Sequence, residues 1–287
     1  MVFEIGTHSG SFHADDVLAV ALLREFVDAA AEVVRTRDLS RLAACDAVVD
    51  VGGVFAPESR RFDHHQKGYQ GARSSAGMVL DWLESQRRVD GGLAARMRAE
   101  LADYVDDVDN GRRTPPRGVP CFASMVGAFV QDLGDGRDVD ARFLDAVSVA
   151  QRYLRGMRAS FAELQRARRV VRAAMQRAAE AGRHTIALPG YLPWKGAYFE
   201  EGGRQHPTEF VLFPAEGAWR VMAIPPEPGS FDNKRSLPAA WASGRQLSIG
   251  ATKSRSAATT STGARTRARE TRSPASAQLP ASRRSSW

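Results

Sequence analysis

The first 110 residues alternate between short apolar runs and longer segments with helical spacing, and this alternation constrains the fold most strongly. The run "VFEIGTHS" ends in a polar loop, and "ADDVLAVALLREFV" then places apolar residues at helical intervals. "EVVRTR" and "DAVVDVGG" are further β-branched runs, the second closed by two glycines. Strands that alternate with helices over short links are typical of a parallel sheet. We therefore predict an α/β fold built on a doubly wound parallel sheet.

Polar side chains follow the predicted strands at the points where those strands end. His8 follows the first strand, Asp50 ends another, and the run from Asp63 to His65 follows "SRRF". Four of the six histidines of the chain lie within its first 65 residues. Ligands of doubly wound sheets bind at the carboxyl ends of the strands. We expect these side chains to gather at that edge.

The loop "THSGSFHADD" can turn three of its side chains inward together: His8, His13 and Asp15. We assign Asp16 to the N-terminus of the following helix, where the helix dipole favours a carboxylate. Imidazole and carboxylate ligands without thiolate suit Mn, Fe, Co or Zn, and carboxylates that can bridge suit a two-metal centre. Two metals side by side stabilise an in-line phosphoryl displacement. A further acidic cluster, "DYVDDVDNG", either contributes ligands or is a solvated helix end.

The rest of the chain is predicted to be helical and then strand-rich. A long helical pattern runs from about Val139 to Ala181, and its eight arginines from Arg152 to Arg177 indicate either a polyanion-binding face or an ordinary solvated face. After Gly182 the runs "HTIALPG", "EFVLFP" and "AWRVMAIP" predict a smaller α/β domain. We predict a catalytic domain over 1–137, a helical connection over 138–182, an incomplete substrate-binding domain over 183–242 and a disordered tail over 243–287.

The net charge of +7 belongs to the predicted tail. From Ala242 onward nine Lys or Arg residues face one acid, so that segment carries +8 and residues 1–241 carry −1. The tail is too poor in large apolar side chains to form a core. It is either a basic nucleic-acid-binding arm or, as we favour, an out-of-frame end that replaces a native C-terminus.

The composition indicates a globular protein of the cytoplasm. Apolar residues make up 43% and charged residues 25%, which is ordinary for a chain with a sizeable core. No apolar stretch reaches the length of a membrane span, and the start of the chain lacks a secretory signal pattern. Cys45 and Cys121 are too few for a disulfide framework, and we interpret them as two small, buried apolar residues in a reducing cytosol.

Several segments, taken in order, resemble one known family. "GTHSGSFHADDVLA", "RFDHHQ", "SSAGMVL", "VDNG", "PWK" and "PGSFDNKRSLP" are similar to segments of the DHH phosphoesterase superfamily and, within it, of the melanocyte-proliferating-gene (Myg-type) exonucleases. The resemblance runs from residue 5 to about 241. It implies a DHH-type catalytic domain and a dinuclear metal centre.

The resemblance also implies a role for each matching residue. His8 and His13 would hold one metal, Asp15 and His64 the other, and Asp50 would bridge both. His65 would face the scissile phosphate. Asp109 best matches the last metal-binding aspartate, with Asp106 as the alternative.

The predicted second domain would bind the rest of the substrate. Ser230, Asn233, Lys234 and Arg235 lie in a turn-rich segment that could cradle a phosphate, or could be a plain exposed basic loop. Trp194 and Lys195 could stack a base and pair a phosphate, although Trp194 fits a hydrophobic core equally well. Family members continue with an ordered segment where this chain has its basic tail, which puts substrate affinity in question.

These observations together predict an enzyme. We expect a phosphodiesterase with two divalent cations, Mn²⁺ first and Mg²⁺ or Co²⁺ as alternatives, acting as a 3′–5′ exonuclease on RNA or short oligonucleotides. One alternative is a phosphatase for nucleotides or small phosphoanhydrides. The other is a non-catalytic nucleic-acid- or metal-binding remnant. No membrane association and no obligate protein partner are expected.

Overall fold

The computed structural model describes residues 2–131 and 138–238. The predicted basic tail, with its two interpretations, lies outside the described residues. In chain order the elements are β1 (Glu4–Thr7), α1 (Ala14–Phe26), β2 (Glu32–Arg35), α2 (Leu39–Ala43), β3 (Ala47–Val49), β4 (Phe55–Ala56), η1 (Pro57–Ser59), β5 (Arg61–Phe62), α3 (Ser75–Ser85), α4 (Gly91–Met97), the π-helical turn η2 (Arg98–Ala102), α5 (Asp103–Asp109), α6 (Phe122–Val130), α7 (Val139–Glu180), β6 (Thr185–Ala187), α8 (Trp194–Glu200), β7 (Phe210–Ala215) and β8 (Ala218–Ala223).

The first sheet has the strand order β2-β1-β3-β5-β4. β2, β1, β3 and β5 are parallel, whereas β4 is antiparallel to β5. The predicted α/β fold is thus confirmed, with a mixed rather than a purely parallel sheet. The antiparallel edge has a simple cause, because only η1 and Arg60 separate β4 from β5. A link that short can close a hairpin but cannot make the crossover that a parallel pair requires.

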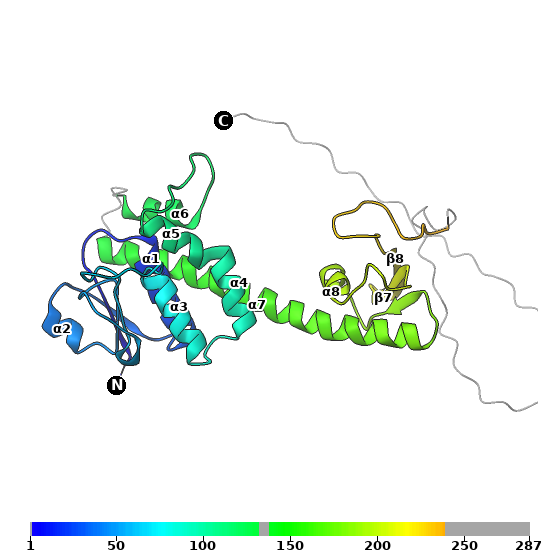
Figure 1. Cartoon of the computed structure of the whole chain (residues 1–287), viewed down its shortest axis with the longest axis horizontal. Coiled ribbons are helices and arrows are strands. Elements are labelled where there is room, and N and C mark those ends of the chain that lie inside the picture. Colours follow the sequence, from blue (N-terminus) through cyan, green and yellow to red (C-terminus); the bar gives the residue numbers. More distant parts are fainter. Residues whose placement is uncertain (1, 132–137, 239–287) are drawn as a thin grey trace, which may run out of the picture. The chain divides into compact units, whose positions relative to one another are not determined.

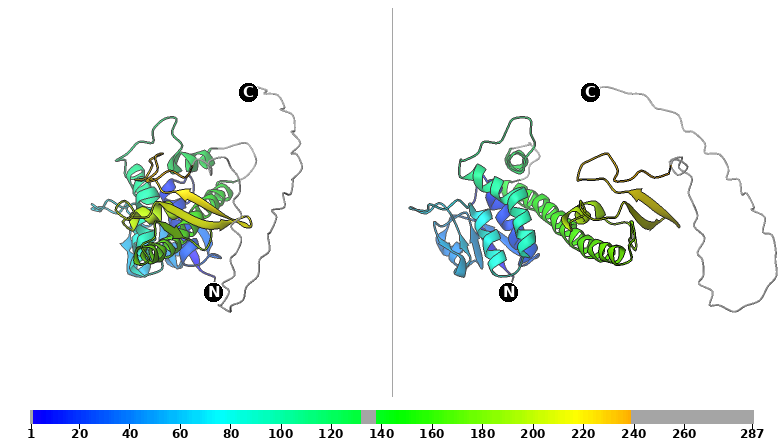
Figure 2. Two further views of the ribbon diagram at one scale, coloured as in Figure 1. Left: turned by 90° about the vertical axis from the view of Figure 1, so that its right-hand side faces the viewer. Right: turned by 45° about the vertical axis from the view of Figure 1, so that its right-hand side comes forward.

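Helices cover the two faces of this sheet unequally. α1 and α3 pack side by side on one face (Figure 1, Figure 2) and share a hydrophobic core with Ala47 and Val49 of β3. On the other face Val48 packs with Cys45 and with Leu42 of the short helix α2. This alternation of inward and outward side chains is the two-residue period of a strand covered on both sides. Cys45 is a buried free thiol, as predicted, and its burial raises its pKa, whereas Cys121 is only half-buried.

The first turn of α3 is held by a carboxylate from another helix. Ser74 occupies the N-cap position of α3, but its hydroxyl donates to Oδ1 of Asp106 at 2.7 Å. The same oxygen accepts from the backbone N–H groups of Ser74 (3.0 Å) and Gly77 (3.1 Å). A Cβ added to Gly77 would collide with Asp106 and with the Arg73 stem. This close approach leaves room for glycine only.

We therefore expect opposite effects from two glycine substitutions in helices. Gly77→Ala should lower the free energy of unfolding by about 1–3 kcal/mol, the usual cost of overpacking a tight site. Gly156→Ala, in α7, should raise it by up to about 1 kcal/mol, because its added Cβ meets open space and alanine is the better helix former. Thermal unfolding of both variants measures this. A Gly77→Ala protein that melts at or above the parent temperature contradicts this account of the α3 turn.

A second hydrophobic core is built from the latter part of α7, the helix α8 and a second sheet with the order β6-β7-β8. The bounds of α7 confirm the long helix predicted from about Val139 to Ala181, and the three predicted strands are present. α8 was not predicted, since its short sequence "WKGAYFE" lies between a proline and a glycine-rich turn. The boundaries at 137, 182 and 242 stay a prediction.

Four of the eight α7 arginines from Arg152 to Arg177 are paired with acidic side chains of the described residues. Arg155 and Arg158 contact Glu25 of α1 at 2.8 and 2.9 Å. Arg168 contacts Glu200 at 3.1 Å, and Arg172 contacts Glu201 at 2.6 Å. A longer contact joins Arg168 to Glu201. These pairings reduce the positive charge that the helix offers to a polyanion and favour the interpretation as an ordinary solvated face.

Among the described residues, no helix combines the length and the apolar character that crossing a bilayer requires.

Candidate metal centre

The carboxyl ends of three neighbouring strands deliver the predicted side chains to one place. His8 follows β1, Asp50 follows β3 and Asp63 follows β5, and these strands are adjacent and parallel. The pairing extends one step beyond the strands, because the N–H of Asp50 donates to the carbonyl of Phe62 at 3.0 Å. This register brings His64 and His65 beside Asp50.

Asp50 lies at the middle of the cluster. Its Oδ2 is 3.3 Å from Nε2 of His8, and its Oδ1 is 3.4 Å from Nε2 of His64 and 3.2 Å from Nδ1 of His65. The hydroxyl of Ser75, in the first turn of α3, donates to the same Oδ1 at 3.4 Å. Asp50 has a positive φ of 53°, a conformation that non-glycine residues rarely adopt and that is frequent at functional sites.

The first turn of α1 adds a second set of ligands. His13 is the N-cap residue, and Asp16 accepts its backbone N–H at 2.9 Å, as predicted for a carboxylate at this helix start. The other oxygen of Asp16 lies 3.2 Å from Nε2 of His8, a contact that the sequence did not suggest. Asp15 is fully buried, and neither of its carboxylate oxygens has a hydrogen-bond partner within the described residues.

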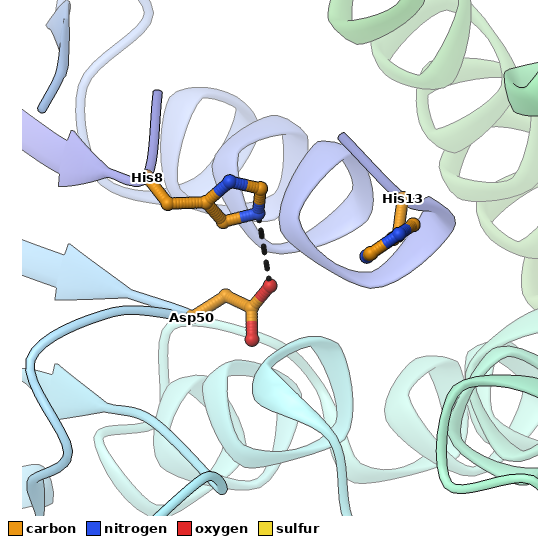
Figure 3. Close-up of side chains that lie close together, drawn as sticks. All are labelled: His8, His13 and Asp50. Carbon is orange, nitrogen blue, oxygen red and sulfur yellow. Dashed lines mark ion pairs between the residues drawn. The ribbon is translucent and has the colours of Figure 1, made fainter. Parts of the chain in front are cut away.

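Among the described residues there are three groups of side chains in which the donor atoms, one from each residue, lie within 4.8 Å of one another. The groups are His8, His13 and Asp50; Asp50, His64 and His65; and His13, Asp15 and Asp109. In Figure 3 the rings of His8 and His13 and the carboxylate of Asp50 lie around a common space. Asp50 and His13 each belong to two groups. Every first-choice ligand predicted from the sequence is therefore in this cluster, together with His65.

The charges of the cluster perturb the pKa values of its members. Burial alone lowers the pKa of His64, but the carboxylates of Asp109 and Asp50 beside its ring outweigh it and raise the pKa to about 10. For His8, burial is likewise outweighed by Asp16 and Asp50, which raise its pKa to about 9. Burial raises the pKa of Asp15 well above its usual range, and repulsion from Asp50 and Asp109 adds to it. Burial opposes ionisation of Asp50 too, but contacts with three histidines outweigh it and lower its pKa.

These observations fit a site for divalent cations. Asp15 is a buried carboxylate without a partner, and Nε2 of His64 is buried without a hydrogen bond among the described residues. Such groups are costly to bury unless a cation satisfies them. Imidazole and carboxylate donors together are the set that Mn²⁺, Fe²⁺, Co²⁺ and Zn²⁺ accept.

Neighbouring groups orient the histidines. The carboxylate of Asp63 lies 2.9 Å from Nδ1 of His65 and also accepts the backbone N–H of Gly53 at 2.6 Å. Oδ1 of Asn110 lies 3.3 Å from Nδ1 of His64, so Nε2 points to Asp50 and Asp109. Such outer contacts fix the ring orientation of metal-binding histidines. The role of Asn110 was not predicted from the sequence, although this residue lies in the "VDNG" segment.

The alternative ligand Asp106 has its oxygens committed elsewhere. Besides the three bonds to α3 described above, its Oδ2 accepts from Arg73 at 3.1 Å. Asp109, one turn further along α5, lies 3.1 Å from Nε2 of His64 and joins one of the three groups. This placement favours Asp109 as the ligand and gives Asp106 a structural role.

The cluster opens into a pocket of about 510 Å³. Its lining residues are His8, Ser11, His13, Arg37, Asp50, Val51, Gly52, Gly53, Asp63 and His65. The side chain of His65 is 63% exposed, whereas that of His64 is 7% exposed. His65 therefore faces the space that a substrate can enter. Arg37 was not among the site residues predicted from the sequence.

The predicted substrate-binding residues lie in the part that contains the second core. Trp194 is buried in that core with 2% exposure, which favours its interpretation as a core residue. The ammonium of Lys234 donates to the carbonyls of Gly203 (2.6 Å) and His206 (2.8 Å) and to the hydroxyl of Tyr198 (3.1 Å), so all three of its N–H groups have acceptors.

The other predicted substrate contacts are more accessible. Lys195, Asn233 and Arg235 are exposed, and Ser230 is half-buried. Arg235 lies 3.3 Å from Glu209, and the hydroxyl of Ser230 accepts the N–H of Asp232 at 3.0 Å. A role of these four residues in substrate binding stays a prediction.

The fold and the site define an α/β protein with a candidate metal centre at the carboxyl edge of its sheet. The chain belongs to the MYG1_exonuc family, described as uncharacterised protein family UPF0160, whose model matches residues 4–253. It is 38% identical over 224 residues to a MYG1 protein of Chlamydia trachomatis, an alignment that covers 77% of this chain and 75% of that one. It is also 34% identical to the MYG1 exonuclease of Mus musculus and 33% identical to that of Homo sapiens, over 83% of this chain and 73% and 74% of the relatives.

Proposed function

We propose that this chain is a metal-dependent phosphodiesterase that acts as a 3′–5′ exonuclease on RNA or short oligonucleotides. The observation that carries the proposal is the position of Asp50, whose carboxylate belongs to two of the three ligand groups. A carboxylate shared in this way is what a dinuclear site requires of its bridging ligand. Two of the relatives described above are named exonucleases, which supports a nucleic-acid substrate.

The proposed ligand sets are those that the family resemblance implies, and they are supported by the distances of 3.9, 3.4 and 3.1 Å from Nε2 of His64 to Asp15, Asp50 and Asp109. His8, His13 and Asp50 would hold one cation, and Asp50, His64, Asp15 and Asp109 would hold the other. Mn²⁺ is the first candidate, with Mg²⁺ or Co²⁺ as alternatives. Cations bound there would stabilise the charge that develops on the phosphoryl oxygens during in-line displacement.

His65 is proposed to contact the scissile phosphate directly. Its Nδ1 is engaged by Asp63 and Asp50 at 2.9 and 3.2 Å, which leaves the Nε2 edge for a substrate oxygen. The hydrogen bond to Asp50 is the main cause that raises the pKa of His65, and this favours a protonated ring. A protonated ring can donate a hydrogen bond from Nε2 to a phosphoryl oxygen whose negative charge grows in the transition state.

A phosphatase for nucleotides or small phosphoanhydrides is the second candidate function. A pocket of about 510 Å³ is within the usual range for small-molecule sites, so it would accept one nucleotide. A non-catalytic remnant is less consistent with a cluster in which every first-choice ligand is present. A cytoplasmic location stays a prediction.

A substrate panel separates these functions. With Mn²⁺, the protein should release nucleotides from short RNA and cleave a dinucleotide, and it should hydrolyse pyrophosphate and nucleoside monophosphates far more slowly. RNA labelled at either end and followed over time gives the polarity, which we expect to be 3′ to 5′. Faster hydrolysis of pyrophosphate or monophosphates than of the dinucleotide would favour the phosphatase, and a metal-loaded protein inert on the whole panel would contradict both enzymes.

A further inference from the structure

Arg37 comes to the edge of the sheet that carries the candidate metal centre. It lies two residues after β2, which runs parallel to β1 with Arg35 opposite Thr7. The N–H of Thr36 donates to the carbonyl of Thr7 at 2.8 Å and extends this pairing. Because parallel strands end at a common edge, Arg37 emerges beside His8, and both line the pocket described above.

The loop that carries Arg37 is ordered on both sides. Asp38 caps the N-terminus of α2, accepting the N–H of Ser40 at 2.8 Å, and its own N–H donates to the hydroxyl of Thr36 at 3.1 Å. The backbone of Arg37 is thus held between a strand pairing and a helix cap. Its side chain starts from a fixed point next to the pocket.

Arg37 differs from its neighbour Arg35, which is fully used in the fold. The guanidinium of Arg35 lies 2.6 Å from Asp140, donates to the carbonyl of Gly10 at 2.7 Å and packs 4.6 Å from the centre of the Phe143 ring. Arg37 is exposed, and no residue in the ranges 2–131 and 138–238 makes a hydrogen bond or an ion pair with its side chain. The fold therefore does not account for this charge.

The carboxylates that line the pocket do not need Arg37 as a counter-ion. Asp50 is contacted by three histidines, and both oxygens of Asp63 accept hydrogen bonds from Gly53 and His65. Among the described residues that line the pocket, Arg37 is the only lysine or arginine. It is therefore a permanent cation that has no partner in the part of the chain that the structure describes, and it lines the pocket of a site proposed to hold phosphate.

We propose that Arg37 forms an anion-binding subsite that holds a phosphate group of the substrate against the candidate metal centre. The planar guanidinium presents paired N–H groups that match two phosphoryl oxygens, a geometry that lysine cannot reproduce. The inference rests on the proposed function in taking the ligand to be a phosphate ester. It adds a residue that contacts the substrate from β2, a strand that supplies no proposed ligand.

The test uses the full chain loaded with Mn²⁺ and two probes, adenosine 5′-monophosphate and adenosine, which differ only in the phosphate. Calorimetry on the parent, Arg37→Ala and Arg37→Lys gives the affinities, and metal analysis of each protein is run in parallel. Arg88→Ala is the matched control, because Arg88 is exposed, has no described partner and follows the far end of α3, whose first turn contacts Asp50. Arg37→Ala should weaken the binding of adenosine 5′-monophosphate about ten- to hundredfold, the usual range for a charge-assisted hydrogen bond.

The other expected results follow from the phosphate contact. Adenosine affinity and Mn²⁺ content should not change in Arg37→Ala, Arg37→Lys should recover only part of the loss, and Arg88→Ala should match the parent. Equal monophosphate affinity in the parent and Arg37→Ala overturns the inference, as does an equal loss in Arg88→Ala. Binding is measured without turnover, so the two proposals fail separately. A protein that cleaves no diester but binds the monophosphate through Arg37 contradicts the exonuclease alone, and one that cleaves diesters with an unchanged KM in Arg37→Ala contradicts the subsite alone.

Discussion

Asp50→Asn should reduce turnover on a dinucleotide by more than about 10³-fold, because loss of a single transition-state stabiliser already costs about 10²–10³-fold. An amide carries no charge and cannot bridge two cations, so the variant should also hold less metal. Its metal-free fold should stay intact. Asparagine tolerates the left-handed backbone conformation that Asp50 adopts at φ 53° better than most residues do.

Metal analysis and thermal unfolding measure these effects together. Mn²⁺ should raise the melting temperature of the parent by several degrees, since a ligand that binds only the folded state stabilises that state. The increase on adding Mn²⁺ should be much smaller for Asp50→Asn. Asp46→Asn is the matched control, because Asp46 precedes β3 at the opposite end from Asp50 and accepts the N–H of Glu4 at 2.9 Å. Equal metal content in parent and Asp50→Asn would contradict the assigned bridge.

Substitution of His64 should mainly reduce metal binding, whereas substitution of the adjacent His65 should mainly reduce the catalytic rate. His64→Ala should weaken Mn²⁺ binding by more than about a hundredfold, since even a group that only orients a ligand is worth about 10–100-fold. His65→Ala should keep its metal and slow the chemical step by about 10²–10³-fold. The reason is their placement, because His64 is buried with Nε2 near Asp50, Asp109 and Asp15, whereas His65 is mostly exposed to the pocket.

Titration with Mn²⁺ and single-turnover kinetics on the two variants separate these roles. His184→Ala serves as a control, since His184 is exposed and its Nδ1 lies 3.1 Å from the carbonyl of Pro207. A His65→Ala protein that loses as much metal as His64→Ala would show that His65 is itself a ligand. The group formed by Asp50, His64 and His65 allows that outcome geometrically, because these three side chains lie within reach of one ion.

The convergence of His8, Asp50 and the Asp63–His65 segment could be predicted from the sequence because it follows from topology alone. Parallel strands end at the same edge, so residues that follow separate strands are brought together whatever the details of packing. The antiparallel strand β4 could not be predicted in this way. Its two residues carry too little pattern to be recognised as a strand.

Which of Asp106 and Asp109 is the metal ligand could not be decided from the sequence pattern alone. The two carboxylates lie three residues apart on α5 and so share a helix face. What separates them is the start of α3, whose N–H groups and Ser74 hydroxyl occupy Asp106. That contact joins residues about thirty positions apart, and no local pattern specifies it.

Long side chains gave the largest differences between expectation and structure. Lys234 was assigned to a phosphate cradle, but its ammonium donates to two carbonyls and a phenol hydroxyl. Arg35 and Arg37 are alternate residues in "VRTRD", yet one is anchored to Asp140 and the other lines the pocket. Where a flexible cationic side chain ends depends on the acceptors that the fold brings within its reach.

The most direct test of the metal centre is anomalous diffraction at the manganese absorption edge from crystals soaked in Mn²⁺. We predict two anomalous peaks about 3.5–4 Å apart, the spacing typical of dinuclear sites, with the Asp50 carboxylate between them. His8 and His13 should contact one peak, and Asp15, His64 and Asp109 the other. A single peak, or peaks that Asp50 does not contact, would contradict the dinuclear centre.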